Sequence, residues 1–174
     1  KESFFARIVR ISLFRKPGRV KALPYLIEAE KINSDVLVKQ RLLREIAIIY
    51  ESLENRQREQ EVYEKLLEYS PLNQEYLEKL ARICLMSKNW EKAEKYILLR
   101  YEKLEKELEK AECFFLLGNI YKDGYNRPLE AISYFRKTLD IVPVYLAALS
   151  QVVCIYKIKE DWKSLAECYE ECLS

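Results

Sequence analysis

The chain resembles itself at an interval of about 34 residues, and this repetition limits its fold more than any other feature. Two tryptophans, Trp90 and Trp162, follow similar polar turns 72 positions apart, and each precedes an apolar-patterned segment. The two turns read Lys88-Asn89-Trp90-Glu91 and Glu160-Asp161-Trp162-Lys163. A single repeat of this length cannot enclose a core, so we expect neighbouring repeats to stack and bury a continuous one.

The clearest repeat spans residues 111–143 and combines a Leu-Gly pair with aromatic and small residues at fixed spacing. Its anchors are Ala111, Phe114, Leu117, Gly118, Tyr121, Ala131, Phe135, Thr138 and Pro143. This order resembles the tetratricopeptide repeat (TPR), with one extra residue in the turn at 123–128. The glycine is expected where two helices approach too closely for a side chain. Weaker copies begin at residues 40, 74 and 146.

The resemblance implies an all-α fold, a right-handed α-solenoid of about five stacked helical hairpins, each made of a first helix, a turn and a second helix. One domain over residues 1–174 is expected, with repeats at about 3–39, 40–73, 74–110, 111–145 and 146–174. Pro71 and Pro143 should end second helices, because the residue before a proline is pushed out of the α region. Asn89 and Asp161 should cap the helices that follow them.

Several residues depart from the repeat pattern. Glu59 and Arg100 occupy positions that are usually small, so we expect loose packing or a local shift of the structure around them. The second helix of the third repeat is expected to run on through residues 101–110. The helix that contains Pro24 is expected to begin near residues 20–21, which would place the proline in its first turn.

The composition argues against catalysis. The chain has no histidine, and its three glycines are isolated and cannot build a phosphate-binding loop. Its five cysteines include no Cys-x-x-Cys pair, which favours a reducing, cytoplasmic compartment over a disulfide framework. Cys168 and Cys172 lie one helical turn apart, and we interpret them as core residues in preference to metal ligands. No catalytic residue, cofactor or metal is therefore predicted.

The resemblance implies that the first helices line a concave groove. The candidate partner-binding residues are Arg7, Arg41, Arg44, Glu75, Glu78, Arg82, Phe115, Asn119 and Lys122. This mixed surface would complement a partner with an acidic segment followed by a basic one. Asn119 is the preferred single candidate, because its amide can pair with both the donor and the acceptor of a peptide backbone. An ordinary solvated asparagine is the alternative.

One TPR subfamily grips a C-terminal carboxylate with a lysine and an asparagine at fixed positions of one first helix, together with further residues of the next two. That set is not found here, since Arg44 is followed by Ile48 where the pattern needs asparagine. We therefore predict no carboxylate clamp of that type.

The N-terminal segment allows a second interpretation. Residues 1–21 carry seven basic side chains and one acidic one, and residues 4–16 interleave them with aromatic and aliphatic residues. Such a basic amphipathic helix can lie on an anionic membrane. Packing against the second repeat is the favoured alternative, and nucleic-acid binding is the least favoured.

The last repeat ends without a polar capping helix, which solenoids normally need. We therefore expect the array to be part of a longer chain, or its final helix to be covered by a partner or a second copy. The predicted function is that of a non-catalytic scaffold or adaptor that binds other proteins. The alternative is a membrane-associated assembly or regulatory factor, membrane-proximal in the cell, that uses residues 4–16.

Overall fold

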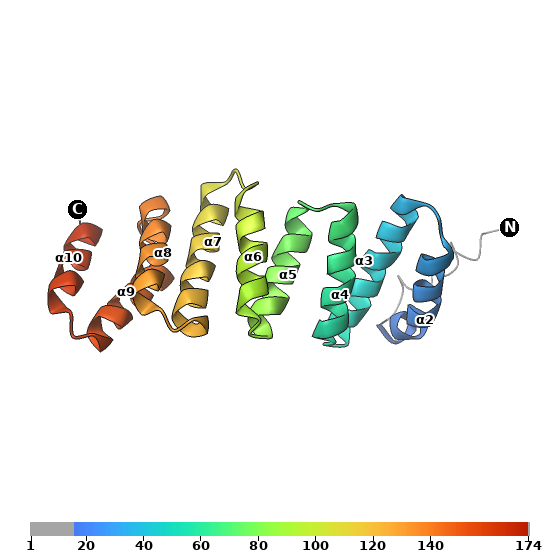
Figure 1. Ribbon diagram of the computed structural model, residues 1–174, viewed down its shortest axis with the longest axis horizontal. Coiled ribbons are helices and arrows are strands. Elements are labelled where there is room, and N and C mark those ends of the chain that lie inside the picture. The colour runs from blue at the N-terminus through green and yellow to red at the C-terminus, as the bar shows by residue number, and fades with distance from the viewer. Residues whose placement is uncertain (1–15, 174) are drawn as a thin grey trace. The chain divides into compact units, whose positions relative to one another are not determined.

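The computed structural model describes the backbone of residues 16–173 and the side chains of residues 20–170 (Figure 1). Within this part of the chain all regular structure is helical, which confirms the predicted all-α class. The chain divides into two compact units, residues 1–83 and residues 84–174. The predicted Arg7 and most of the segment 4–16 lie outside the described residues.

The first unit is built around α3 (Val36–Ser52), which packs against α2 (Lys16–Ile32) and α4 (Arg56–Tyr69). Most of α5 (Gln74–Met86) also belongs to this unit. The apolar stripe of α3 recurs every three or four residues and is buried, as a half-covered helix requires. Its buried residues are Leu42, Leu43, Ile46, Ala47 and Ile49.

The second unit contains α6 (Trp90–Tyr101), α7 (Glu107–Asn119), η1 (Ile120–Gly124), α8 (Pro128–Ile141), α9 (Leu146–Ile158) and α10 (Trp162–Leu173). In it α7 packs between α6 and α8, and α9 packs between α8 and α10 (Figure 1). The buried core at the α8–α10 end comprises Ala131, Ile132, Phe135, Ala148, Val152, Ile155, Tyr156, Leu165 and Cys168.

The turns between first and second helices share one backbone feature. A residue other than glycine has a φ of 53–56° in each, namely Glu54, Lys88, Asn126 and Glu160. The next residue caps the following helix in two predicted cases. The Asn89 side chain accepts a hydrogen bond from the Lys92 amide at 3.3 Å, and Asp161 accepts one from the Ser164 amide at 3.1 Å. Both predicted N-caps are confirmed.

The close helix approach predicted at Gly118 is also confirmed. A Cβ atom added there would lie less than 3.0 Å from three carbon atoms of the Phe135 ring. Phe135 is fully buried, and so is Thr138, whose hydroxyl donates to the Ala111 carbonyl across the α7–α8 interface. Four anchors of the clearest repeat, Ala111, Gly118, Phe135 and Thr138, therefore meet at the interface between α7 and α8.

The predicted extension of the third repeat's second helix through residues 101–110 is wrong. Helix α6 ends at Tyr101, residues 102–106 form a loop, and α7 begins at Glu107. The Lys103 and Leu104 amides donate to carbonyls three residues back, a tight turn that cannot continue an α-helix. This turn buries Leu104, whose side chain is 8% exposed.

The predicted start of the helix around Pro24 is also wrong. Helix α2 begins at Lys16, so Pro17 occupies its first turn and Pro24 lies in its interior. A proline near a helix start costs no intrahelical hydrogen bond, since the N–H groups there have no intrahelical partner. The interior proline leaves the Val20 carbonyl without its usual amide donor, and Pro24 is on the exposed side of the helix, where water can replace it.

Packing loose enough to expose Glu59 or Arg100 to solvent is not found. The two residues are 5% and 7% exposed. The Arg100 guanidinium lies 3.9 Å from the Cys113 sulfur and 3.8 Å from a Glu112 carboxylate oxygen, so the cation is partly compensated. Two large polar side chains are thus accommodated at buried positions of the second helices.

Candidate functional site

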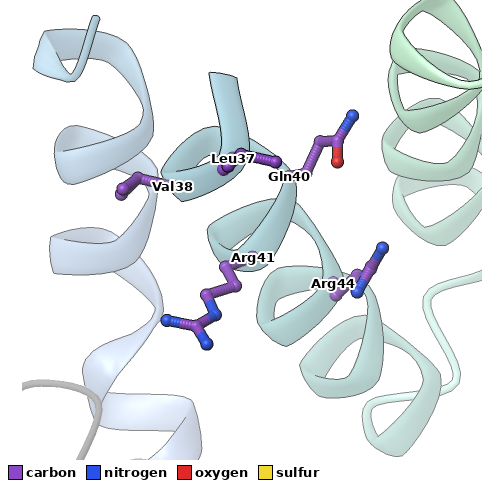
Figure 2. A pocket seen from close by; sticks show the side chains of 5 residues that line it. All are labelled: Leu37, Val38, Gln40, Arg41 and Arg44. Carbon is purple, nitrogen blue, oxygen red and sulfur yellow. The ribbon is translucent and has the colours of Figure 1, made fainter. Parts of the chain in front are cut away.

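Helix α3 carries a basic hollow on its surface, in the first unit. The hollow has a volume of about 350 Å³ and is lined by Leu37, Val38, Gln40, Arg41 and Arg44. Figure 2 shows the Arg41 side chain extending towards α2, whereas Gln40 and Arg44 extend away from it. Both arginines are exposed, which agrees with their predicted place on an open face.

Arg44 is held in position by Tyr76 of α5. Its Nε donates a hydrogen bond of 2.5 Å to the tyrosine hydroxyl, and its guanidinium carbon lies 5.7 Å from the ring centroid. Tyr76 is 2% exposed and its ring centroid lies 6.0 Å from that of Tyr63. A buried aromatic residue therefore fixes an exposed cation, and leaves the terminal amino groups of the guanidinium available to a ligand.

A charged cluster lies further along the same face. Glu51 Oε1 lies 3.0 Å from Lys79 Nζ and 3.2 Å from Arg82 Nη2, which joins α3 to α5. Glu75 and Glu78, predicted on this face of α5, are exposed. The structure thus brings Arg82 together with Glu51, and leaves acidic side chains exposed at the start of α5.

Glu59 of α4 lies buried near this cluster. Burial is the main cause that raises the pKa of its carboxyl group, and the nearby Glu51 carboxylate raises it further. Its Oε1 atom accepts no hydrogen bond from any described residue. Burial is also the main cause that raises the pKa of Tyr63 to about 12, and the Glu51 and Glu59 carboxyl groups raise it further. Both influences act in the same direction, because burial and a nearby negative charge each disfavour the ionised form of a carboxyl group.

The predicted residues of the second unit have mixed environments. The Phe115 ring is half-buried, with centroids 5.8 Å from Phe135 and 5.3 Å from Tyr145. Lys122 Nζ donates to Gln151 Oε1 at 2.6 Å, which ties η1 to α9. Asn119, the last residue of α7, is half-exposed and its side chain makes no cap hydrogen bond. Phe115 therefore contributes mainly to packing, whereas the Asn119 amide is accessible.

Sequence reasoning missed a hydrogen-bonded group around Glu94 of α6. The hydroxyl groups of Tyr121 and Tyr125 donate to its two carboxylate oxygens at 3.0 and 2.6 Å. Burial and the Glu94 hydrogen bond raise the pKa of Tyr125 to about 12, and a hydrogen bond with Tyr134 is the main cause that raises the pKa of Tyr121. The signal in the sequence was the extra residue at 123–128, which the chain absorbs as the π-turn η1.

The π-turn also places Gly124 against Trp90. A Cβ on this glycine would lie 2.7 Å from the indole ring. Beside this contact is a shallow hollow lined by Ser87, Lys88, Asn89, Trp90, Glu91 and Tyr125. Its lining carries both signs of charge, so it shows no preference for a cation or an anion.

The described residues were also compared with the requirements of a metal site and a reactive cysteine. Within them no group of three or more histidine, cysteine, aspartate or glutamate side chains is placed to hold a metal ion. Burial raises the pKa of the Cys113 thiol to about 11, so it is protonated at neutral pH. Cys168 is buried in the core, and Cys172 lies beyond the described side chains. None of the helices in this part of the chain has the length and apolar character that crossing a bilayer needs.

Comparison with known proteins identifies the fold. No protein-family model and no curated protein sequence matches the chain. Among solved structures, MamA 41-end from Desulfovibrio magneticus RS-1 is 22% identical, covering 99% of this chain and 93% of its own, with a TM-score of 0.67. A crystal structure of MamA protein is 17% identical, covering 99% and 90%, with a TM-score of 0.69. PilF of Pseudomonas aeruginosa is 16% identical, covering 97% and 75%, with a TM-score of 0.62.

These identities are low, so the likeness establishes the fold and leaves the function to be argued from the site. MamA and PilF are TPR proteins, and nearly the whole of this chain superimposes on them. The predicted resemblance is confirmed, and the chain has the TPR fold.

Proposed function

We propose that this protein is a non-catalytic interaction scaffold that binds a partner peptide or helix along the exposed faces of its first helices. The observation that carries the proposal is that α3 has one buried apolar face and one exposed basic face. One face buries Leu42, Leu43 and Ile46, whereas Arg41 and Arg44 on the other face are exposed. Helix-in-groove recognition needs such a rigid face with side chains that remain accessible.

The second unit supports the same proposal through α7. Its buried residues, among them Leu117 and Gly118, fix the helix against α8, while Asn119 stays accessible at its end. An amide that offers both a donor and an acceptor suits the backbone of a bound segment. We therefore assign partner binding to the first-helix faces of each unit.

The test is capture of partners by the tagged full chain from an extract of its native organism, followed by mass spectrometry. We expect the Arg44→Glu/Asn119→Ala variant to lose partners that the wild type captures, because a charge is reversed on one face and an amide is removed from the other. Circular dichroism should show unchanged helicity, since both residues are accessible.

The matched control is Arg58→Glu/Ser133→Ala, which makes comparable changes on the second helices α4 and α8. Arg58 and Ser133 are exposed, and their hydrogen bonds are local. The control should capture the same partners as the wild type. The proposal is wrong if both double variants capture every partner at the wild-type level.

The membrane alternative depends on residues 4–16, most of which lie outside the described part of the chain. Its test is sedimentation with anionic liposomes, with and without residues 1–19. Equal pelleting of the two forms would exclude the alternative. A reducing, cytoplasmic location likewise stays a prediction from the cysteine pattern.

A further inference from the structure

Four residues of α3 form an exposed stripe with an ordered chemical pattern. Leu37, Arg41, Arg44 and Ile48 follow one another at intervals of four, three and four residues, so they share one face of the helix. Leu37 is 73% exposed and Ile48 is 40% exposed. The stripe thus presents two cations between two aliphatic side chains, over about 16 Å of helix.

The two arginines of the stripe differ from their basic neighbours in having no carboxylate partner within the described part of the chain. On the same face, Lys79 and Arg82 are both paired with Glu51. Among the described residues, no carboxylate forms an ion pair with Arg41 or Arg44. Their charges are therefore available to a ligand without breaking an existing contact.

Arg44 is also oriented before any ligand arrives. The Tyr76 hydroxyl accepts from its Nε, and the guanidinium lies over the tyrosine ring. A side chain that is already fixed loses less rotamer freedom on binding, which favours affinity. Its terminal amino groups have the fork geometry that pairs with a carboxylate.

We propose that the stripe Leu37–Arg41–Arg44–Ile48 binds an acidic segment of a partner protein, in which two carboxylates are flanked by apolar residues. This inference rests on the proposed scaffold function and names the chemistry of its partner. Charge complementarity selects the carboxylates, and the exposed Leu37 and Ile48 select the flanking apolar residues. On the C-terminal side Lys79 and Arg82 are already paired with Glu51, so the contact with the partner's carboxylates is assigned to Arg41 and Arg44.

A nucleic acid fits this face less well. Binding of single strands combines cations with exposed aromatic rings on which bases stack. The aromatic residue at this site, Tyr76, is 2% exposed, and its hydroxyl accepts a hydrogen bond from Arg44. The exposed residues beside the arginines are aliphatic.

The test is selection from a displayed library of randomised peptides against the full-length wild-type chain. We expect the enriched peptides to contain more aspartate and glutamate than the starting library, with apolar residues on both sides of an acidic pair. The same selection against Arg41→Glu/Arg44→Glu should lose this acidic excess. The matched control, Arg58→Glu/Lys65→Glu on α4, changes the net charge equally and should keep it.

Affinity measurements then test how much the carboxylates of the selected peptide contribute to binding. A labelled peptide from the selection should bind the wild type and the control variant with equal affinity by fluorescence anisotropy. Replacing its acidic pair by glutamine, or both arginines by glutamate, should each weaken binding about tenfold or more, as loss of charge-assisted hydrogen bonds implies. Circular dichroism verifies that both variants keep the wild-type helicity.

The outcomes separate this inference from the proposed function. Enriched peptides without an acidic excess would overturn the acidic specificity and leave the scaffold function standing. No enrichment against any form would count against both. Tight binding of polyuridine that depends on Arg41 and Arg44, without binding of acidic peptides, would replace the inference with an RNA site.

Discussion

Gly118 shows how one residue sets the distance between two helices. The Phe135 ring occupies the space that a side chain at position 118 would need. This ring is fully buried, so it has no room to move aside. We expect Gly118→Ala to lower the free energy of unfolding by about 1–3 kcal/mol, the usual cost of overpacking a core. Urea unfolding followed by circular dichroism measures it.

Gly124 supplies the control for that substitution. A Cβ there would meet the Trp90 indole, but this ring is only half-buried and can rotate outward. Gly124→Ala should therefore cost less than Gly118→Ala. Equal costs for the two variants would show that the Phe135 contact does not determine the helix spacing.

Glu59 gives a prediction about pH. Its folded-state pKa is raised above the reference value of 4.5, chiefly by burial, so the protonated form is the one that folding favours. The carboxyl group thus contributes stability below the unfolded pKa, and this contribution is lost as the pH rises through the folded pKa. We expect Glu59→Gln to raise the melting temperature at neutral pH.

The gain from Glu59→Gln should shrink as the pH falls well below the reference pKa of 4.5, because the wild-type carboxyl then becomes protonated in both states. Thermal unfolding of both proteins over a series of pH values measures the difference. The exposed Glu75→Gln variant is the control, since its carboxylate is solvated. A gain from Glu59→Gln that stays constant with pH would contradict the buried-carboxyl interpretation.

At the scale of the element, the turns define where second helices begin. Asn89 accepts a hydrogen bond from the Lys92 amide, one of the α6 donors that lack an intrahelical partner. We expect Asn89→Ala to destabilise the protein by about 1 kcal/mol, the typical cost of losing an N-cap. Asn89→Asp, which keeps an acceptor oxygen, should retain the stability in chemical unfolding experiments. If alanine and aspartate behave alike, the cap contributes nothing.

The ends of helices are harder to predict from the sequence than their interiors. Within the described residues, the repeat pattern located the interiors of the helices, because apolar spacing reflects which face is buried. It misplaced the end of α6 and the start of α2, because the tight turn at residues 102–104 and the beginning of α2 at Lys16 are local features that the repeat pattern does not contain. The repeat pattern shows an extra residue near Asp123, but it does not show the π-turn η1 or the hydrogen bonds of Tyr121 and Tyr125 with Glu94.

At the scale of the whole molecule, the final helix carries an exposed apolar face. Trp162 is 62% exposed and Tyr169, two turns further along α10, is 43% exposed. We expect the protein to self-associate through this face as its concentration rises, because burial of apolar surface favours association. Sedimentation-velocity experiments over a range of concentrations should show the increase, and Trp162→Ser/Tyr169→Ser should suppress it.

The control for self-association is Leu129→Ser on α8, which removes an apolar side chain of 64% exposure from another place in the same unit. This variant should associate like the wild type. Monomeric behaviour of the wild type at every concentration would exclude α10 as a contact between copies.

The sequence by itself determined the class of fold, the repeat and the close approach at Gly118. These features depend on the spacing of apolar residues and on side-chain size, which can be read directly from the sequence and act locally. It also determined which residues of α3 are exposed, since the opposite face carries the apolar stripe. Only the tertiary structure decided which exposed groups find partners. Arg82 and Arg44 both stand on predicted binding positions, yet Arg82 pairs with Glu51 whereas Arg44 is oriented by Tyr76. These contacts join residues about 30 positions apart, and packing of separate helices, which no local pattern encodes, brings them within hydrogen-bonding distance.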